Sequence, residues 1–229
     1  VITACPSKDE EARALHALYR HTAYNAPHSA GHWLREVAPV LEDAQRPIIV
    51  GGTGLYFTAL TQGLADIPET PPEVRWQGDK LDLAFMLEQL DLDTVSRIDV
   101  ANRARVQRAW EVHTSTGRGL ARWQDETPPP LVDPEHSFNI VLDAEKEWLT
   151  PRIEQRFDLM VAGGAMDEIA SMDVHYDPTL PSCRAIGVPE LIKCHRGELD
   201  LQAAREEACI ATRQYAKRQR TWFRSKMKK

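Results

Sequence analysis

The stretch that most constrains the fold is residues 47–57, which read PIIVGGTGLYF. Apolar and β-branched residues 47–50 run directly into Gly-Gly-Thr-Gly at 51–54, and a helical pattern begins at Leu55. This order predicts a buried parallel strand that ends in a tight turn. The glycines leave the Thr53 hydroxyl as the only side chain of the turn, and ligands bind at such strand ends in open α/β sheets. An ordinary glycine turn is the alternative interpretation.

The rest of the chain alternates helical and apolar stretches in the way that predicts a parallel α/β layer. Residues 8–18 predict a short charged helix, and Ser29 is the expected N-cap of a second helix over 29–41. A returning strand is expected over 136–142, which contains FNIVL. After it we expect a long helix over 149–172 interrupted at Gly163-Gly164, a loop with a glycine turn over 180–191, and a final helix over 201–223.

Prolines bracket a section of different character, at 68, 71 and 72 and again at 128–130. The section between them has helical periods and no convincing strand, which predicts a helical insertion with proline-rich hinges. We therefore expect a core made of residues 1–62 and 133–229 and an insertion domain over 63–132. The expected apolar positions of its two clearest helices are Leu81, Phe85, Leu87 and Leu90 in one and Val106, Ala109, Trp110 and Val112 in the other.

Composition indicates a soluble globular chain, with 27% charged and 42% hydrophobic residues among 229. No apolar run approaches the roughly 18 residues that a membrane span requires, and nothing resembles a targeting peptide, so the cytoplasm is expected. The four cysteines form no CxxC pair, which predicts reduced thiols and no metal site. The formal net charge is −6, but the residues after Glu207 include eight basic and no acidic side chains. Such a local basic surface can bind phosphates.

Seven stretches in order carry a resemblance to a known family: GGTGLYF, PEVR, RARVQRAWEV, TGRGLARWQ, RIEQRFDLM, AIG and ATRQYAKRQRTWFR. The chain resembles the tRNA dimethylallyltransferases, also called the tRNA isopentenyltransferase or IPP transferase family. The resemblance implies transfer of a dimethylallyl group from dimethylallyl diphosphate to the exocyclic amine of the adenosine beside the anticodon, with release of diphosphate. It also implies a P-loop NTPase-like parallel sheet, nucleotide binding, Mg²⁺, a tRNA anticodon stem-loop as partner, no membrane and a monomer.

One hallmark of that family is missing, because no G-x-x-x-x-G-K-[ST] phosphate cradle occurs in the 229 residues. Residues 1–7, VITACPS, look like a segment that follows the P-loop in the family. We therefore expect the first strand, the cradle and the aspartate that serves as catalytic base to lie upstream of Val1. The stretch over 76–83 is shorter than the family pattern, so residues are expected to be missing there as well.

The resemblance implies catalytic roles at three positions. Thr53 lies at the substrate end of the predicted strand, with Gly51, Gly52 and Gly54 lining the channel beside it. Arg152 and Arg156 are four residues apart and share a helix face. The family holds its leaving diphosphate partly with an arginine of this region, and we favour Arg152 over Arg156. Salt bridges to acids such as Glu147 are the alternative for both.

Contacts to tRNA are implied for several basic residues. A stripe of Arg213, Lys217, Arg220 and Arg224 steps along the final helix by four, three and four residues. Tyr215, Trp222 and Phe223 lie off this stripe and are expected to anchor the helix. A solvated surface is the alternative for every one of these charges. The residues assigned to tRNA are Arg75, Arg105, Arg108, Arg184, Gly187, Lys217, Arg218, Arg220 and Arg224, and Pro189 stands where family members often have arginine.

Two other functions remain open on these residues. A P-loop small-molecule kinase shares the fold but has no use for a basic terminal helix. An RNA-binding protein that has lost catalysis would explain the missing cradle. The residues upstream of Val1 would separate the two from a transferase.

Overall fold

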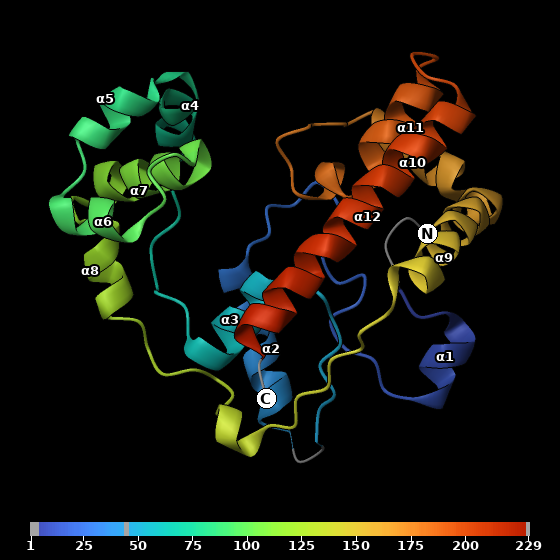
Figure 1. Cartoon of the computed structure of the whole chain (residues 1–229), viewed down its shortest axis with the longest axis horizontal. Coiled ribbons are helices and arrows are strands. Elements are labelled where there is room, and N and C mark those ends of the chain that lie inside the picture. Colours follow the sequence, from blue (N-terminus) through green and yellow to red (C-terminus); the bar gives the residue numbers. More distant parts are fainter. Residues whose placement is uncertain (1–4, 44–45, 228–229) are drawn as a thin grey trace. The chain divides into compact units, whose positions relative to one another are not determined.

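The computed structural model describes residues 5–43 and 46–227 (Figure 1). The chain divides into two compact units, Val1–Tyr56 with Phe138–Lys229, and Phe57–Ser137. The helix α3 (Gly54–Gln62) spans the boundary between them. Each unit has its own helices and its own core, so we take them one at a time. No helix in the described ranges has the length and apolar character that crossing a membrane requires.

The first unit opens with a charged helix and a long irregular segment. Helix α1 (Lys8–Arg13) begins with a capping box, in which the Glu10 N–H donates to Ser7 Oγ and the Ser7 N–H donates to the Glu10 carboxylate. It ends before the predicted residue 18, because Ala14 is extended and the chain then takes left-handed turns at Leu18 and Arg20. Helix α2 (Ala30–Leu41) starts at the predicted cap, Ser29, which accepts from the His32 N–H.

The two predicted strands are not formed, and the described residues contain no β-strand. Residues 46–50 and 137–145 run without regular secondary structure, and Ile48 and Phe138 are 89% and 90% exposed. A parallel strand is stable only when a neighbouring strand satisfies its N–H and C=O groups. Neither segment has such a neighbour among the described residues, so their apolar side chains stay in solvent.

The core of the first unit lies among four helices. They are α9 (Lys146–Met160), α10 (Met166–Asp173), α11 (Val188–His195) and α12 (Leu201–Lys226). A π-helical turn, η2 (Val161–Ala165), separates α9 from α10 where Gly164 has a φ of 99°, which confirms the predicted glycine break. A short 3-10 turn, η3 (Ser182–Arg184), precedes α11. The predicted loop over 180–191 was wrong in part, because α11 begins inside it at Val188 and continues to His195.

Apolar side chains of these helices meet in one cluster. The fully buried members include Ile169 and Leu191, and α12 contributes Ala204, Ala208 and Cys209. Small residues on α12 let it approach α9 and α11 closely, and all four cysteines are free thiols as expected. The N-terminal half of α12 is therefore held by packing, and its C-terminal half is left for other contacts.

The regular secondary structure of the second unit is helical, as predicted. Its helices are α4 (Pro72–Lys80), α5 (Leu83–Glu88), α6 (Leu92–Arg97), α7 (Arg103–Thr116) and α8 (Leu120–Asp125), followed by the 3-10 turn η1 (Pro134–His136). Helix α7 packs on α4 and α5 through Val106, Ala109 and Trp110. Phe85 was expected in this core and is 47% exposed, because α5 begins at Leu83 and turns Met86 inward instead.

Candidate functional site

The glycine-rich loop at residues 51–54 is held by one face of α12. Thr53 Oγ1 lies 3.0 Å from the Tyr215 hydroxyl oxygen, and Gln219 Nε2 donates to the Gly52 carbonyl oxygen at 3.1 Å. A Cβ on Gly54 would stand 2.6 Å from the Trp222 ring, so only glycine allows this approach. Tyr215 and Trp222 anchor α12 as predicted, and Gln219 is a further contact that the sequence did not indicate.

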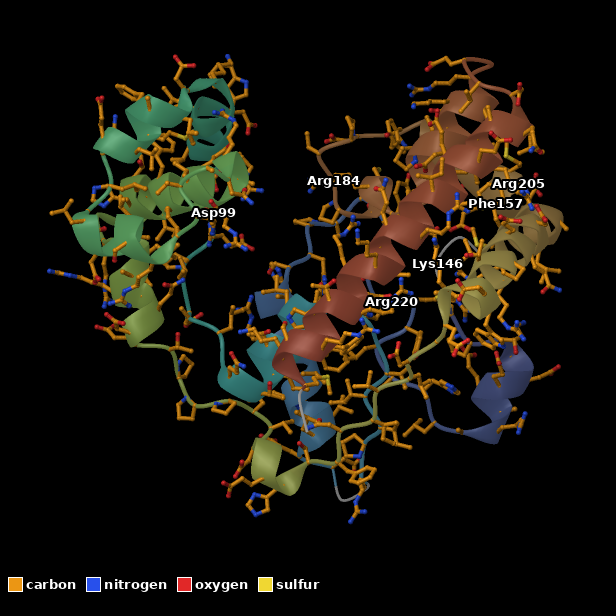
Figure 2. The ribbon with its side chains drawn as sticks, in the orientation of Figure 1. Asp99, Lys146, Phe157, Arg184, Arg205 and Arg220 are labelled. Carbon is orange, nitrogen blue, oxygen red and sulfur yellow. The ribbon has the colours of Figure 1, made fainter. Side chains whose placement is uncertain are left out.

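A second face of α12 lines a groove against α9. The groove has a volume of about 540 Å³. Its lining residues are Lys146, Leu149, Thr150, Ile153, Arg213, Gln214, Ala216, Lys217, Arg220, Thr221 and Arg224. All four members of the predicted stripe are among them, and Lys146 adds a fifth cation from the start of α9 (Figure 2). Its position one turn before Thr150 on α9 is the signal by which Lys146 could have been found.

The five cations of the groove differ in their partners. Arg213 and Arg224 form long ion pairs, 3.7 Å to Glu154 and 3.6 Å to Asp143. Lys217 and Arg220 form no ion pair within residues 5–43 and 46–227. Their charge therefore remains uncompensated in the described structure, which is the electrostatic condition for binding an anion. Arg218 does not line the groove, and its guanidinium lies 5.6 Å from the centre of the Tyr215 ring.

Neither Arg152 nor Arg156 lines the groove. The groove uses Lys146, Leu149, Thr150 and Ile153, whereas the Arg152 guanidinium stacks 3.6 Å from the Trp148 ring centre. Both arginines are exposed, and neither pairs with Glu147 or another acid in the described part of the chain. The alternative of a salt bridge therefore finds no partner here.

In the second unit, a buried carboxylate holds two of the arginines assigned to tRNA. The Glu111 side chain is 4% exposed, and its Oε2 lies 3.4 Å from Arg75 Nη2 and 3.9 Å from Arg108 Nη1. Arg108 also donates to Thr70 Oγ1 at 2.6 Å. Burial lowers the pKa of the Arg108 guanidinium, although Glu111 opposes this. Arg105, one turn earlier on α7, is exposed.

The glycine turn before α11 has a structural role, because it caps that helix. Gly187 has a φ of 100° and caps α11, and its N–H donates to the Glu190 carboxylate at 2.9 Å. A left-handed residue is needed there, which explains the glycine. Arg184 is exposed in the turn η3.

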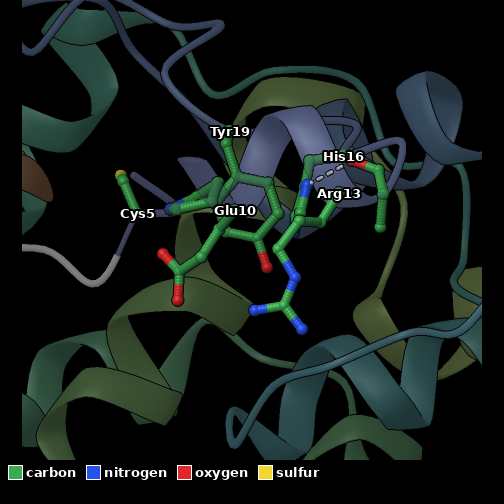
Figure 3. Close-up of a pocket in the computed structure, with 7 residues that line it drawn as sticks. Cys5, Glu10, Arg13, His16 and Tyr19 are labelled. Atoms are coloured by element: carbon green, nitrogen blue, oxygen red, sulfur yellow. Dashed lines mark hydrogen bonds between the residues drawn. The ribbon is translucent and has the colours of Figure 1, made fainter. Parts of the chain in front are cut away.

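A separate cavity of about 500 Å³ lies beside α1 (Figure 3). Its lining includes the Glu10 carboxylate, the Arg13 guanidinium, and the His16 and Tyr19 rings. His16 Nδ1 lies 2.8 Å from the Ala14 carbonyl oxygen. The sequence did not indicate this cavity, since irregular backbone between Ala14 and Tyr19 forms it.

The residues described do not fit a resident Mg²⁺ site. Magnesium requires hard oxygen ligands in octahedral geometry. Within the described ranges, the one group of three or more metal-binding side chains is His21, His28 and Glu36, in which two of the three ligands are imidazoles. Thr53 Oγ1, the hydroxyl of the glycine-rich loop, is engaged by Tyr215.

Comparison with known proteins gives one consistent answer. Residues 1–226 match the family described as IPP transferase. The tRNA dimethylallyltransferase of Roseobacter denitrificans is 61% identical over all of this chain and 82% of its own length. The corresponding protein of Ruegeria sp. is 58% identical over all of this chain and 79% of its own.

Two solved structures show the same fold. The tRNA isopentenylpyrophosphate transferase of Staphylococcus epidermidis aligns with a TM-score of 0.62 at 26% identity, over 97% of this chain and 76% of its own. A eukaryotic dimethylallyltransferase that acts on tRNA aligns with a TM-score of 0.76 at 22% identity, over 95% of this chain and 58% of its own. The agreement covers nearly the whole chain in each case.

Proposed function

Because the chain belongs to the IPP transferase family, we propose that it transfers a dimethylallyl group from dimethylallyl diphosphate to the exocyclic amine of the adenosine beside the tRNA anticodon. Diphosphate is the leaving group. The observation that carries the proposal from the chain's own residues is the α9–α12 groove, where Lys217 and Arg220 lack acidic partners in the described structure. A helix that keeps uncompensated cations along one stripe, at a repulsive cost, suits a polyanion such as RNA.

The proposed roles divide between the two faces of α12. Thr53 orients the donor at the glycine-rich loop, where Gly51, Gly52 and Gly54 let substrate approach the backbone. The Tyr215 hydroxyl, 3.0 Å from Thr53 Oγ1, fixes the orientation of that side chain. RNA phosphates bind along the cations of the groove.

Further contacts are proposed for residues outside the groove. Arg152, or Arg156, binds the diphosphate, since a guanidinium can hold two phosphate oxygens at once. Arg75, Arg105, Arg108, Arg184, Gly187 and Arg218 are the remaining residues assigned to tRNA. Of these, Arg105, Arg184 and Arg218 are exposed without a described ion pair, which favours them as direct contacts.

The described residues supply only some of the groups that the reaction requires. The amine of adenine is a weak nucleophile, because its lone pair is delocalised into the ring, so catalysis requires a positioned base and a held leaving group. The target base must also leave its stack to reach the pocket. No residue of the described chain is assigned as the base. Mg²⁺ is proposed to enter with the diphosphate as part of the substrate, since proteins commonly bind it through phosphates.

Finer features of the proposal rest on the family alone. These are the P-loop NTPase-like parallel sheet, nucleotide binding, the anticodon stem-loop as the recognised part of tRNA, a monomeric state and a cytoplasmic location. The solved relatives support a common fold, because the alignment covers nearly the whole chain, and the parallel sheet itself stays a prediction. The other features stay predictions.

The test is transfer of label from dimethylallyl diphosphate to an anticodon stem-loop RNA by the purified full-length protein. A matched RNA in which the target adenosine is replaced by purine riboside lacks the accepting amine and must stay unlabelled. Equal labelling of both RNAs would overturn the assignment of the acceptor.

The two alternatives give different outcomes in the same assay. A small-molecule kinase transfers phosphate from ATP and leaves the prenyl label untouched. A binding protein without catalysis retains the RNA on a filter and transfers nothing. The relatives' names favour the transferase over both.

A further inference from the structure

Half of the chain's histidines lie in one short segment. His16, His21, His28 and His32 fall within 17 residues, out of eight histidines in the sequence. The first three belong to the irregular segment between α1 and α2, and His32 lies in the first turn of α2. The role proposed above for the glycine-rich loop and the groove uses none of them.

Three side chains of this segment converge on a single point. His21 Nε2 lies 2.8 Å from Glu36 Oε2, and His28 Nε2 lies 3.1 Å from the same oxygen. One ligand atom from each of the three residues lies within 4.8 Å of the other two. Glu36 sits on α2, whereas both imidazoles come from the preceding segment, so the cluster joins irregular chain to a helix.

The arrangement matches the ligand set of a zinc-type ion. Imidazole nitrogens and carboxylate oxygens bind Zn²⁺ at about 2.0–2.2 Å in a tetrahedron, which places neighbouring ligand atoms about 3.3 Å apart. The distances of 2.8 and 3.1 Å from His21 Nε2 and His28 Nε2 to Glu36 Oε2 are close to that spacing. Two histidines and one carboxylate leave a fourth position for water, as in zinc sites with three protein ligands.

The neighbouring rings support the cluster from outside. The His28 ring stacks on His32 with centroids 5.9 Å apart, and His21 meets His28 edge-on at 5.7 Å. His32 Nδ1 lies 2.8 Å from Ser29 Oγ, the N-cap of α2. The stacking on His32 restricts the orientation of the His28 imidazole. Helix α2 thus supplies both a ligand and a support.

We propose that His21, His28 and Glu36 form a binding site for a divalent transition-metal ion of the zinc class, which cross-links the segment before α2 to that helix. The ion is bound in place of the two hydrogen bonds to Glu36, with each imidazole presenting the lone pair of Nε2. The site is separate from the proposed transfer reaction, and its role is to order the segment between α1 and α2.

Without a metal, the same atoms form an ordinary hydrogen-bonded cluster. Each imidazole then donates an Nε2–H to Glu36, and these bonds, that of His28 first, lower the pKa of the carboxyl group. The cluster is in that case indifferent to Zn²⁺. The two interpretations therefore differ in a measurable property.

The test is a Zn²⁺ titration of the chelator-treated, purified full-length protein, followed by calorimetry and by metal analysis after dialysis. His21→Gln, His28→Gln and Glu36→Gln each remove one ligand, and each is expected to weaken Zn²⁺ binding at least tenfold. His136→Gln is the matched control, because His136 pairs with a single carboxylate, Asp133, at 2.9 Å. Equal affinity of the three variants and the parent would overturn the proposal.

Two further measurements test the proposal even if a variant folds poorly. Zn²⁺ should raise the melting temperature of the parent and of His136→Gln, because a ligand that binds only the folded state stabilises it by mass action. Co²⁺ in the same site should give the visible absorption of a tetrahedral nitrogen and oxygen site. A thiolate charge-transfer band would place the ion on a cysteine and overturn the assignment.

Discussion

Two arginines of α7 and two basic residues near the end of α12 lie in opposite electrostatic surroundings. On α7, Arg103 donates to the carbonyl oxygens of Leu81, Gly78 and Asp79 at the end of α4. Arg108 is held by Glu111 and Thr70. On the last turns of α12, Lys217 and Arg220 have no acidic partner in the described ranges. Basic residues on a helix can therefore either bind groups within their own unit, as Arg103 and Arg108 do, or remain without an acidic partner in the described structure, as Lys217 and Arg220 do.

The two helices differ in whether neighbouring acidic or carbonyl groups compensate the charge of these basic side chains. Arg103 and Arg108 of α7 bind groups of α4, the preceding chain and Glu111, so their charge is compensated inside the second unit. Along α12 the change occurs within one helix, because Arg205 near its start is bonded to Asp158 of α9 at 2.6 and 2.9 Å. After Arg213, the described part of α12 has more basic side chains than acidic partners for them. A basic helix is thus best interpreted turn by turn.

The largest expected effect concerns unpaired arginines outside the groove. Arg152→Ala or Arg156→Ala should lower the rate of the chemical step about 10²-fold or more, the usual loss when a charge-stabilising donor is removed. Affinity for RNA should change little, since neither residue lines the groove. Single-turnover rates measure the step.

Gln155→Ala, an exposed position of the same helix, is the control for the two arginines. If both arginine variants retain the parent rate, exposed arginines on α9 are surface charge and the diphosphate site lies elsewhere.

The next effect tests the structural role of the α7 arginines. Arg108→Met keeps the apolar stem but removes the bonds to Thr70 and Glu111, and should lower the free energy of unfolding by about 1–3 kcal/mol. Arg105→Met, on the same helix and exposed, should change it by less than about 0.5 kcal/mol. Urea unfolding followed by circular dichroism measures both. Equal losses would remove the contrast between paired and unpaired arginines.

A smaller effect tests the groove. Lys217→Ala and Arg220→Ala should each weaken tRNA binding and flatten its logarithmic salt slope by about 0.7 to 0.9, because one phosphate contact is lost with its released counterions. Lys193→Ala is the control, since Lys193 pairs with Glu207 and lies outside the groove. Isotherms at several salt concentrations that superimpose on those of the parent would make the stripe ordinary solvated surface.

The smallest effect concerns the paired half of α12. Hydrogen bonds from Arg205 lower the pKa of the Asp158 carboxyl group in the folded protein. The stabilisation is therefore present above the ordinary aspartate pKa of about 3.9 and is lost as the pH falls through the lowered folded value. Asp158→Asn should destabilise the protein at neutral pH, and the difference from the parent should vanish in acid.

Urea midpoints across that pH range measure the effect, with Asp66→Asn at an exposed aspartate as control. A difference that persists unchanged in acid would show that Asp158 stabilises by packing and not through its charge.

Local signals predicted the helices well. Ser29 as N-cap predicted α2, and the two glycines at 163 and 164 predicted the turn between α9 and α10, because capping and left-handed backbone depend on neighbours in sequence. The two predicted strands were wrong for the described residues. A strand requires pairing with another strand, and a local sequence pattern does not encode that pairing. Lys146 and the convergence of His21, His28 and Glu36 were missed for the same reason, as tertiary packing brings them together.

The clasp of α12 on the glycine-rich loop has a thermodynamic consequence. Tyr215, Gln219 and Trp222 hold the loop, and Lys217 and Arg220 on the same turns line the groove. An anion bound in the groove restrains these turns of α12. The loop then loses less conformational entropy when it closes on a ligand. By reciprocity, a ligand in the loop strengthens anion binding by the same factor. In the function proposed above, a single helix would thereby couple the two substrates without any change of shape.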